Sequence, residues 1–159
     1  MSLTLSRPTV VDLAVLANAM SAEERRQYET ATGLPHSADG VARSVVLFGG
    51  VEYLALDDAG NPVSAFGCFP LGGGVWQTWM VSRHDAFALH GRALSRLLRR
   101  VLVGLLDGDN VRRIQTYASA DRAAACRWYR KALGMTAEGV LRGFYPDGSD
   151  AATFAITRA

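Results

Sequence analysis

The sequence contains a single lysine, Lys131, and only two cysteines, Cys68 and Cys126, among its 159 residues. Two cysteines are too few for a disulfide scaffold, and both are typical of small buried hydrophobic residues. The three histidines have no cysteine or histidine partner at metal-ligand spacing, so we expect no metal site. No apolar run is long enough to span a bilayer, and the N-terminus lacks a secretory pattern. We therefore expect a protein of the cytoplasm, or of a particle assembled there, with no membrane partner.

The composition is that of a globular protein, with 49% hydrophobic and 20% charged residues. The length fits one domain covering residues 1–159. Sixteen arginines stand against the one lysine, a bias that a GC-rich genome explains better than a function does. The net charge of +2 is far below that of a dedicated nucleic-acid binder, so we do not expect a nucleic-acid partner.

The hydrophobic period alternates between that of strands and that of helices along the chain. It predicts strands at 2–7, 51–56, 63–69, 75–81, 112–117, 135–145 and 151–157, two or three helices within 9–48, and helices at 91–106 and 123–133. This order predicts an α+β, or mixed α/β, architecture in which helices flank a central mixed sheet of six or seven strands.

Several polar residues stand where a helix is expected to begin. Thr9 with Asp12 and Ser21 with Glu24 have the spacing of a capping box, and Asp121 is a candidate cap for the helix at 123–133. The helix at 91–106 is strongly amphipathic, with Leu94, Leu97, Leu98, Val101, Leu102 and Leu105 on one face and Arg92, Arg96, Arg99 and Arg100 largely on the other. The arginine face, joined in sequence by Arg112 and Arg113, is either a solvated surface or a surface that binds nucleic acid.

The junction at residues 82–93 leads from a strand into a helix N-terminus, which is a favourable place for an anion. Gly91 permits close backbone approach, and Arg83, His84, His90 and Arg92 add positive or potentially positive charge. An ordinary strand-to-helix connection with a solvated end has the same residue types, so both interpretations stay open here.

The strand order and this junction resemble the GNAT superfamily of acyl-CoA-dependent N-acyltransferases. In that family an Arg/Gln-x-x-Gly-x-Gly/Ala loop holds the pyrophosphate of coenzyme A. Gly91 and Ala93 match this pattern, whereas Ala88 replaces the Arg or Gln. The resemblance implies that the amides of residues 88–93 bind the pyrophosphate, with help only from Arg83 or Arg92.

The same resemblance implies where acetyl-CoA and the catalytic groups lie. Acetyl-CoA would lie in the splay between the strands at 75–81 and 112–117, with the backbone of Met80 and Val81 holding the pantetheine arm. Many family members place a proton-donating Tyr four residues before the Gly that here is Gly134. That position is Arg130, and Tyr129 lies one place away. Tyr129 is either the proton donor or, like most aromatic residues, a packing residue.

General bases of this family often lie on or beside strands, where this chain has Glu52, Asp57, Asp58 and Glu138. Glu52 is our first candidate because its strand directly precedes the central hairpin. An exposed carboxylate on a strand with no special neighbour is the simpler interpretation of all four.

A narrower resemblance is to the GNAT-like internal virion proteins of short-tailed bacteriophages of the T7 type. It is carried by Arg7-Pro8-Thr9, by Phe69-Pro-Leu-Gly-Gly73, by Leu89-His-Gly-Arg-Ala93 and by Phe154-Ala-Ile-Thr-Arg158. This resemblance implies a protein associated with the virion or its assembly, with portal or tail proteins or further copies of itself as partners. The degenerate loop, with bulky Phe87 and Leu89, implies a closed cleft, weak or absent acetyl-CoA binding and little catalysis. The alternative is an active acetyl-CoA-dependent N-acetyltransferase acting on a small-molecule or protein amine.

Overall fold

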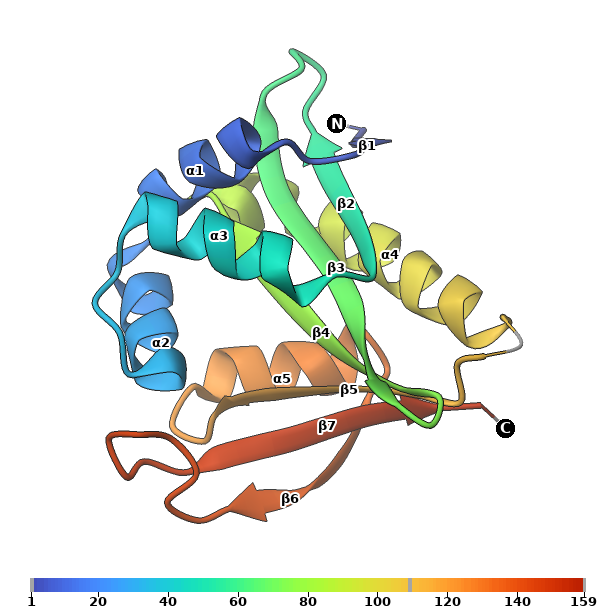
Figure 1. Cartoon of the computed structure of the whole chain (residues 1–159). Coiled ribbons are helices and arrows are strands. Elements are labelled where there is room, and N and C mark those ends of the chain that lie inside the picture. Colours follow the sequence, from blue (N-terminus) through green and yellow to red (C-terminus); the bar gives the residue numbers. More distant parts are fainter. Residues whose placement is uncertain (1, 109, 159) are drawn as a thin grey trace.

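The structure is a computed structural model that describes residues 2–108 and 110–158. These residues contain one seven-stranded sheet in the order β1-β2-β3-β4-β5-β7-β6 (Figure 1). The strands are β1 (Thr4–Ser6), β2 (Val51–Leu56), β3 (Pro62–Gly72), β4 (Val75–Ser82), β5 (Arg113–Ser119), β6 (Thr136–Leu141) and β7 (Ala151–Thr157). The β4–β5 pair is parallel, and the other neighbouring pairs in this sheet are antiparallel. The predicted mixed sheet of six or seven strands is confirmed.

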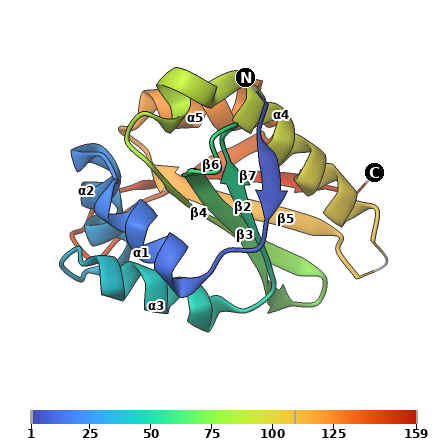
Figure 2. The same cartoon turned by 90° about the horizontal axis from the view of Figure 1, so that it is seen from above.

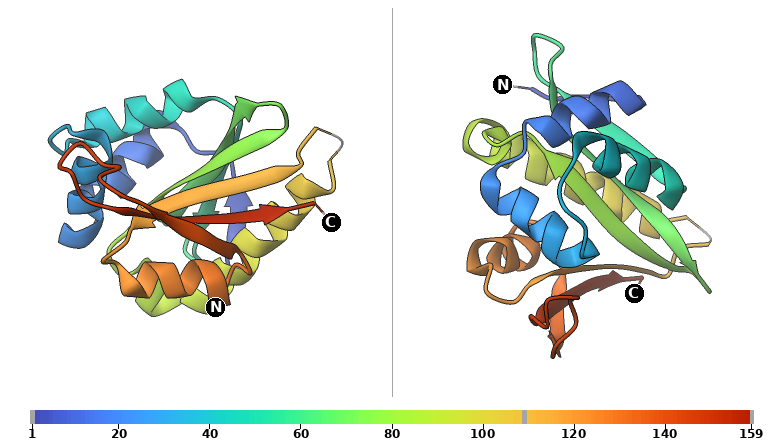
Figure 3. Two further views of the ribbon diagram at one scale, coloured as in Figure 1. Left: turned by 90° about the horizontal axis from the view of Figure 1, so that it is seen from below. Right: turned by 60° about the vertical axis from the view of Figure 1, so that its left-hand side comes forward.

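Five helices accompany this sheet in the described residues. They are α1 (Val10–Asn18), α2 (Ala22–Thr32), α3 (Ala38–Phe48), α4 (Ala86–Leu106) and α5 (Ala123–Lys131). Helices α1 and α3 pack together on one face of the sheet, and α4 and α5 lie on the opposite face (Figures 2 and 3). None of the described helices has the length and apolar character needed to cross a membrane.

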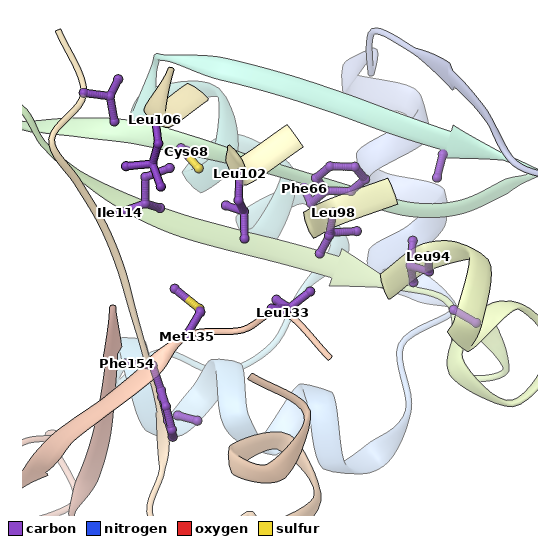
Figure 4. Close-up of a cluster of buried hydrophobic side chains, with 14 of the residues drawn as sticks. Phe66, Cys68, Leu94, Leu98, Leu102, Leu106, Ile114, Leu133, Met135 and Phe154 are labelled. Atoms are coloured by element: carbon purple, nitrogen blue, oxygen red, sulfur yellow. The ribbon is translucent and has the colours of Figure 1, made fainter. Parts of the chain in front are cut away.

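Each face of the sheet has its own hydrophobic cluster. The consecutive residues Leu54 and Ala55 of β2 belong to different clusters, because side chains alternate along a strand. The larger cluster lies under α4, where Leu94, Leu98, Leu102 and Leu106 pack on Phe66, Cys68 and Ile114 (Figure 4). Four buried leucines at intervals of four residues confirm the predicted apolar face of this helix.

The predicted capping box at Thr9 is complete, whereas at Ser21 the structure shows only the bond to the Ser21 side chain. The Thr9 amide donates to the Asp12 carboxylate at 2.8 Å, and the Asp12 amide donates back to Thr9 Oγ1 at 3.2 Å. Ser21 accepts from the Glu24 amide at 3.1 Å at the start of α2. The prediction for Asp121 is wrong, because the residue at the N-cap of α5 is Arg122 and no side chain caps that helix.

The start of α4 differs most from the sequence-based expectation. The helix begins at Ala86, five residues before the predicted Gly91, so residues 88–93 are helical and do not form a loop. Ala86 and His90 are buried and continue the stripe of Leu94 at a spacing of four residues. Packing of this stripe on the sheet outweighs the cost of about 1 kcal/mol that a glycine adds inside a helix.

Candidate active site

The parallel strands β4 and β5 separate after three paired positions. Val75 pairs with Arg113, Trp76 with Ile114 and Gln77 with Gln115, and no later pair joins the two described strands. Beyond Gln77, the edge of β4 that faces β5 has no strand partner. Figure 1 shows the two strands diverging from the lower right toward α2, with α5 behind the opening. Met80 and Val81 lie on this unpaired part of β4, at the place where the sequence analysis expected a pantetheine arm.

Tyr129 reaches this opening from α5. The Tyr129 hydroxyl lies beside the Thr116 side chain, and Thr116 is the first β5 residue beyond the last β4–β5 pair. The Tyr129 ring stacks on Phe154 with ring centroids 5.2 Å apart. Burial raises the pKa of the Tyr129 phenol above its ordinary value near 10, and the nearby Thr116 side chain opposes that shift. The phenol is therefore protonated at neutral pH and able to donate its proton.

An aromatic contact joins α4 to α5 beside Tyr129. The Trp128 indole packs on Tyr129 with centroids 5.1 Å apart, and its Nε1 donates to Ser95 Oγ at 2.8 Å. Phe87, in the first turn of α4, meets Trp128 edge to face with centroids 5.1 Å apart. Trp128 of α5 thus contacts two side chains of α4, the Phe87 ring and the Ser95 hydroxyl. We call these three side chains the aromatic bridge between the two helices that cover this side of the opening.

The first turns of α4 do not present the converging amides that the resemblance implied. The amide of Leu89 donates to Asp85 O at 3.0 Å as part of the helix, and Gly91 has no positive φ. Two adjoining hollows nevertheless follow the exposed side of this helix. One of about 400 Å³ is lined by residues 87–93 and Arg96, and one of about 410 Å³ lies between α4 and Ala132 at the end of α5.

Two of the predicted phosphate-binding residues are used elsewhere. Arg83 is part-buried, donates from Nε to Asp85 at 2.5 Å, and lies 3.8 Å from the Asp57 carboxylate. It lines neither hollow, so the expectation that it assists at Gly91 is not supported by its contacts. His90 is buried against the sheet, and its Nδ1 has no hydrogen-bond partner among the described residues. Arg92 does line both hollows.

The candidate bases lie away from Tyr129. Glu52 alternates along β2 with Tyr53, which packs in the α4–α5 cluster, so Glu52 points to the opposite face. It makes no hydrogen bond or salt bridge to any other described residue. Hydrogen bonds from the Asn61 backbone lower the pKa of Asp57, and a hydrogen bond from Arg113 lowers the pKa of Glu138. These two carboxylates are held as structural anions.

A polar network on the α1–α3 side of the opening was not foreseen. Gln115 accepts from Arg113 Nε at 2.9 Å and donates from Nε2 to Tyr117 Oη at 2.8 Å. Arg113 also binds Glu138 on β6 through two hydrogen bonds. The alternation Arg-x-Gln-x-Tyr was visible in the sequence as one face of a strand, but nothing in it indicated that this face borders an opening. Among the described residues no group of three or more His, Cys, Asp or Glu side chains is arranged to hold a metal ion.

The described residues thus form a mixed sheet that opens between two parallel strands, with a helix behind the opening. No protein-family model matches the chain, and no curated protein matches it by sequence. Solved structures do match. AAC(6')-Ib in complex with paromomycin and acetyl-CoA has a TM-score of 0.74 at 22% identity, covering 99% of this chain and 94% of its own.

Two further structures carry the same fold. Spermidine N-acetyltransferase from Vibrio cholerae, in complex with CoA and spermine, has a TM-score of 0.75 at 14% identity, covering 98% of this chain and 95% of its own. A GNAT-family acetyltransferase from Bacillus anthracis also has a TM-score of 0.75 at 14% identity, covering 99% of this chain and 95% of its own. The chain therefore has the GNAT fold.

Proposed function

We propose that this protein is an acyl-CoA-dependent N-acetyltransferase whose reaction takes place in the β4–β5 opening. The observation that carries the proposal is the position of Tyr129, whose side chain lies beside Thr116 where the two strands part. The unpaired edge of β4 at Met80 and Val81 offers backbone groups to the amides of a pantetheine arm. The likeness to structures solved with CoA or acetyl-CoA supports the same cofactor.

When bound, acetyl-CoA supplies a thioester carbonyl that an amine nitrogen attacks, so that an amide forms and the carbon–sulfur bond breaks. Tyr129 donates its phenolic proton to the leaving sulfur and regains one from solvent. The proton lost by the amine goes to Glu52 or to water on the α1–α3 face, where Glu52 is free of other partners in the described part of the chain. A general acid of this kind contributes about a hundredfold or more to the rate.

The first turns of α4 favour weak cofactor binding. Residues 88–93 are helical, Ala88 supplies no donor side chain, and the aromatic bridge of Phe87, Ser95 and Trp128 joins the two helices on the cofactor side. One charged hydrogen bond to phosphate is worth about 1.5–3 kcal/mol, so its loss weakens binding by about ten- to a hundredfold. We expect acetyl-CoA to bind, but more weakly than in a site with an open loop.

Calorimetric titration of acetyl-CoA into the wild type and into Ala88→Arg tests both the proposed transferase activity and the expected weak binding of acetyl-CoA. Heat of binding together with release of free thiol in the presence of a primary amine would support the transferase. Tighter binding by Ala88→Arg would show that the missing side chain limits affinity. Micromolar affinity in the wild type would contradict weak binding, and the absence of binding at millimolar acetyl-CoA in both proteins would reject the transferase.

The segments Arg7-Pro8-Thr9 and Phe154-Ala-Ile-Thr-Arg158, which resemble internal virion proteins, are the basis of a second candidate, a virion- or assembly-associated protein that keeps the fold with little or no catalysis. Its partners would be portal or tail-associated proteins, or other copies of this chain. Mass spectrometry of purified phage particles tests it. Absence of the protein from particles, together with a genome context free of phage genes, would remove this candidate.

A further inference from the structure

Helix α1 is apolar on all of its sides. Only two of its nine residues are polar, and Leu13 and Leu16 are buried in the cluster between this helix and the sheet. A helix that is hydrophobic all round is normally covered all round. The outer side of α1 is nevertheless exposed, since Val11 is 70% and Val15 50% exposed. The described residues therefore leave an apolar helix surface without a cover.

Helix α3 extends this apolar surface. Its inner side is buried, and Asp39, Arg43 and Leu47 follow one another at intervals of four residues on its outer side. Leu47 is 84% exposed, the largest exposed fraction of any large hydrophobic residue in the described chain, and Val46 beside it is also exposed. Such a concentration of exposed apolar side chains on neighbouring helices is typical of an interaction surface.

The two helices bring their apolar ends together. Helices α1 and α3 pack side by side and run antiparallel, so the N-terminal end of α1 lies beside the C-terminal end of α3 (Figures 1 and 3). Val11 belongs to the first of these ends, and Val46 and Leu47 belong to the second. We call the exposed side chains of Val11, Val15, Val46 and Leu47 the α1–α3 patch.

The charges beside the α1–α3 patch are balanced. The outer line of α3 carries one charge of each sign, Asp39 and Arg43, which form an exposed salt bridge at 3.0 Å. Helix α1 has no basic residue, and its one carboxylate, Asp12, accepts from the Thr9 amide as part of the helix cap. Anionic lipid headgroups attract helices that have several Lys or Arg residues beside the apolar face, so this surface is poorly suited to a membrane.

We propose that the α1–α3 patch is the two-fold interface of a homodimer, in which α1 of each copy lies on α3 of the other. A two-fold axis parallel to the helices brings Val11 of one copy onto Leu47 of the other, and it repeats the same contact in reverse. The Asn18 end of each α1 then lies on the Asp39 end of the opposite α3, where an amide can donate to a carboxylate. The surface thus complements itself, with apolar ends on apolar ends and polar ends on polar ends.

The proposed interface is held in place before association. Phe48, the last residue of α3, stacks on Phe69 of β3 with ring centroids 4.7 Å apart, so the apolar end of α3 is fixed to the sheet. Association therefore does not have to order this end of the helix. The interface lies on the face of the sheet opposite to α4 and α5, and the inference does not depend on acetyl transfer.

Sedimentation equilibrium of the purified chain tests the assignment. We expect a wild type with twice the 17.1 kDa mass of one chain at micromolar concentrations. Leu47→Glu should raise the Kd of the dimer at least about tenfold, because the dimer would bury a carboxylate among apolar side chains. Val103→Glu is the matched control, since Val103 is an exposed apolar residue of α4 on the opposite face. It should leave the mass unchanged, and circular dichroism confirms that each variant is folded.

A mixture of two variants tests how the helices pair. Val11→Lys should also be monomeric by itself, because two lysines would enter the apolar centre. Mixed with Leu47→Glu, it forms a heterodimer with one Lys–Glu pair and one native contact between Val11 and Leu47. The mixture should therefore recover a dimer that neither variant forms alone. A mixture that stays monomeric overturns the placement of α1 on α3.

The other outcomes also decide the proposal. A wild type that stays monomeric at the highest soluble concentration overturns the dimer, as does a dimer that Leu47→Glu leaves intact. A monomer that binds phosphatidylcholine vesicles, and loses this binding in Leu47→Glu, assigns the α1–α3 patch to a lipid surface instead. Sedimentation needs neither acetyl-CoA nor an amine, so a failure of the dimer leaves the transferase standing, and a failure of the transferase leaves the dimer standing.

Discussion

The indole Nε1 of Trp128 donates a 2.8 Å hydrogen bond to Oγ of Ser95, which itself donates to the Gly91 carbonyl oxygen at 2.7 Å. Through this contact α5 is joined to the second and third turns of α4. Phe87 completes the contact from the first turn by meeting the same indole edge to face. Both sides of the proposed cofactor path are thus connected by one tryptophan.

Phe87→Ala should tighten acetyl-CoA binding and slightly destabilise the fold. An edge-to-face aromatic pair contributes about 0.5–1.5 kcal/mol, and its removal frees space between the two helices. We expect a severalfold lower Kd by calorimetry and a lower Tm by differential scanning fluorimetry. Leu89→Ala is the control, since Leu89 is 54% exposed in the same turn and has no part in the bridge. Weaker binding by Phe87→Ala would mean that the ring supports the ligand.

Tyr129→Phe should lower kcat by about a hundredfold while leaving the Kd for acetyl-CoA nearly unchanged, because the phenol acts on the leaving sulfur. Since burial raises the pKa of Tyr129 above 10, the wild-type phenol stays protonated as the pH rises from 7 to 10. We therefore expect no loss of rate from this group in that range. Steady-state thiol release across pH measures both effects. An unchanged kcat in Tyr129→Phe would return this residue to a packing role.

Arg122→Met should destabilise the protein by about 1–3 kcal/mol. The guanidinium joins α5 to α2, from Nε to Glu23 at 2.9 Å and from Nη2 to Glu24 at 2.8 Å, and its side chain is only 19% exposed. Arg26→Met breaks a pair between the same elements, but Arg26 and Asp121 are 78% and 70% exposed and 3.6 Å apart. That control should change the stability by less than about 0.5 kcal/mol in urea unfolding. Equal effects would contradict the importance of burial here.

Gly67→Ala should cost about 3 kcal/mol of stability. A Cβ at this position would collide with the backbone oxygen of Val51 and would lie 2.9 Å from Nε1 of Trp79, whose indole covers the glycine. Gly104→Ala is the opposite case, because nothing lies within 4 Å of a Cβ there and the residue is inside α4. It should raise stability by about 0.5–1 kcal/mol. Urea denaturation of both variants gives the comparison, and a neutral Gly67→Ala would show that β2 and the Trp79 side chain shift easily.

Stability should fall as the pH rises above 9. Burial raises the pKa of the Cys68 thiol from 9.0 to about 12, so the unfolded chain ionises at a pH where the folded protein does not. The unfolded state then binds fewer protons, and the free energy of unfolding decreases by up to about 1.4 kcal/mol per pH unit. Urea midpoints at pH 7, 9 and 10 in reducing buffer measure this slope. Cys68→Ala should show a shallower slope, and an identical slope would assign the effect to other groups.

Local patterns predicted most of the secondary structure. The Thr9–Asp12 box and the leucines of α4 act between residues three or four apart, so their consequences are readable without the fold. The same reasoning misplaced the start of α4, because Gly91 is a weak helix former and only packing of Ala86 and His90 on the sheet keeps that turn helical. It also misassigned Asp121, because sequence spacing does not determine which residue takes the N-cap position. In the structure that residue is Arg122.

By itself the sequence determined the order of strands and helices, the amphipathic character of α4 and hence the class of fold. These properties depend on hydrophobic period and capping chemistry along the chain. Only the tertiary structure decided that Tyr129 meets Thr116, that Trp128 bonds Ser95 and that exposed apolar residues of α1 and α3 lie on the same face of the sheet. Trp128 and Ser95 are 33 positions apart, and residues so distant meet only because α4 and α5 pack on the same face of the sheet. Their contact follows from how the helices are placed, which no local pattern encodes.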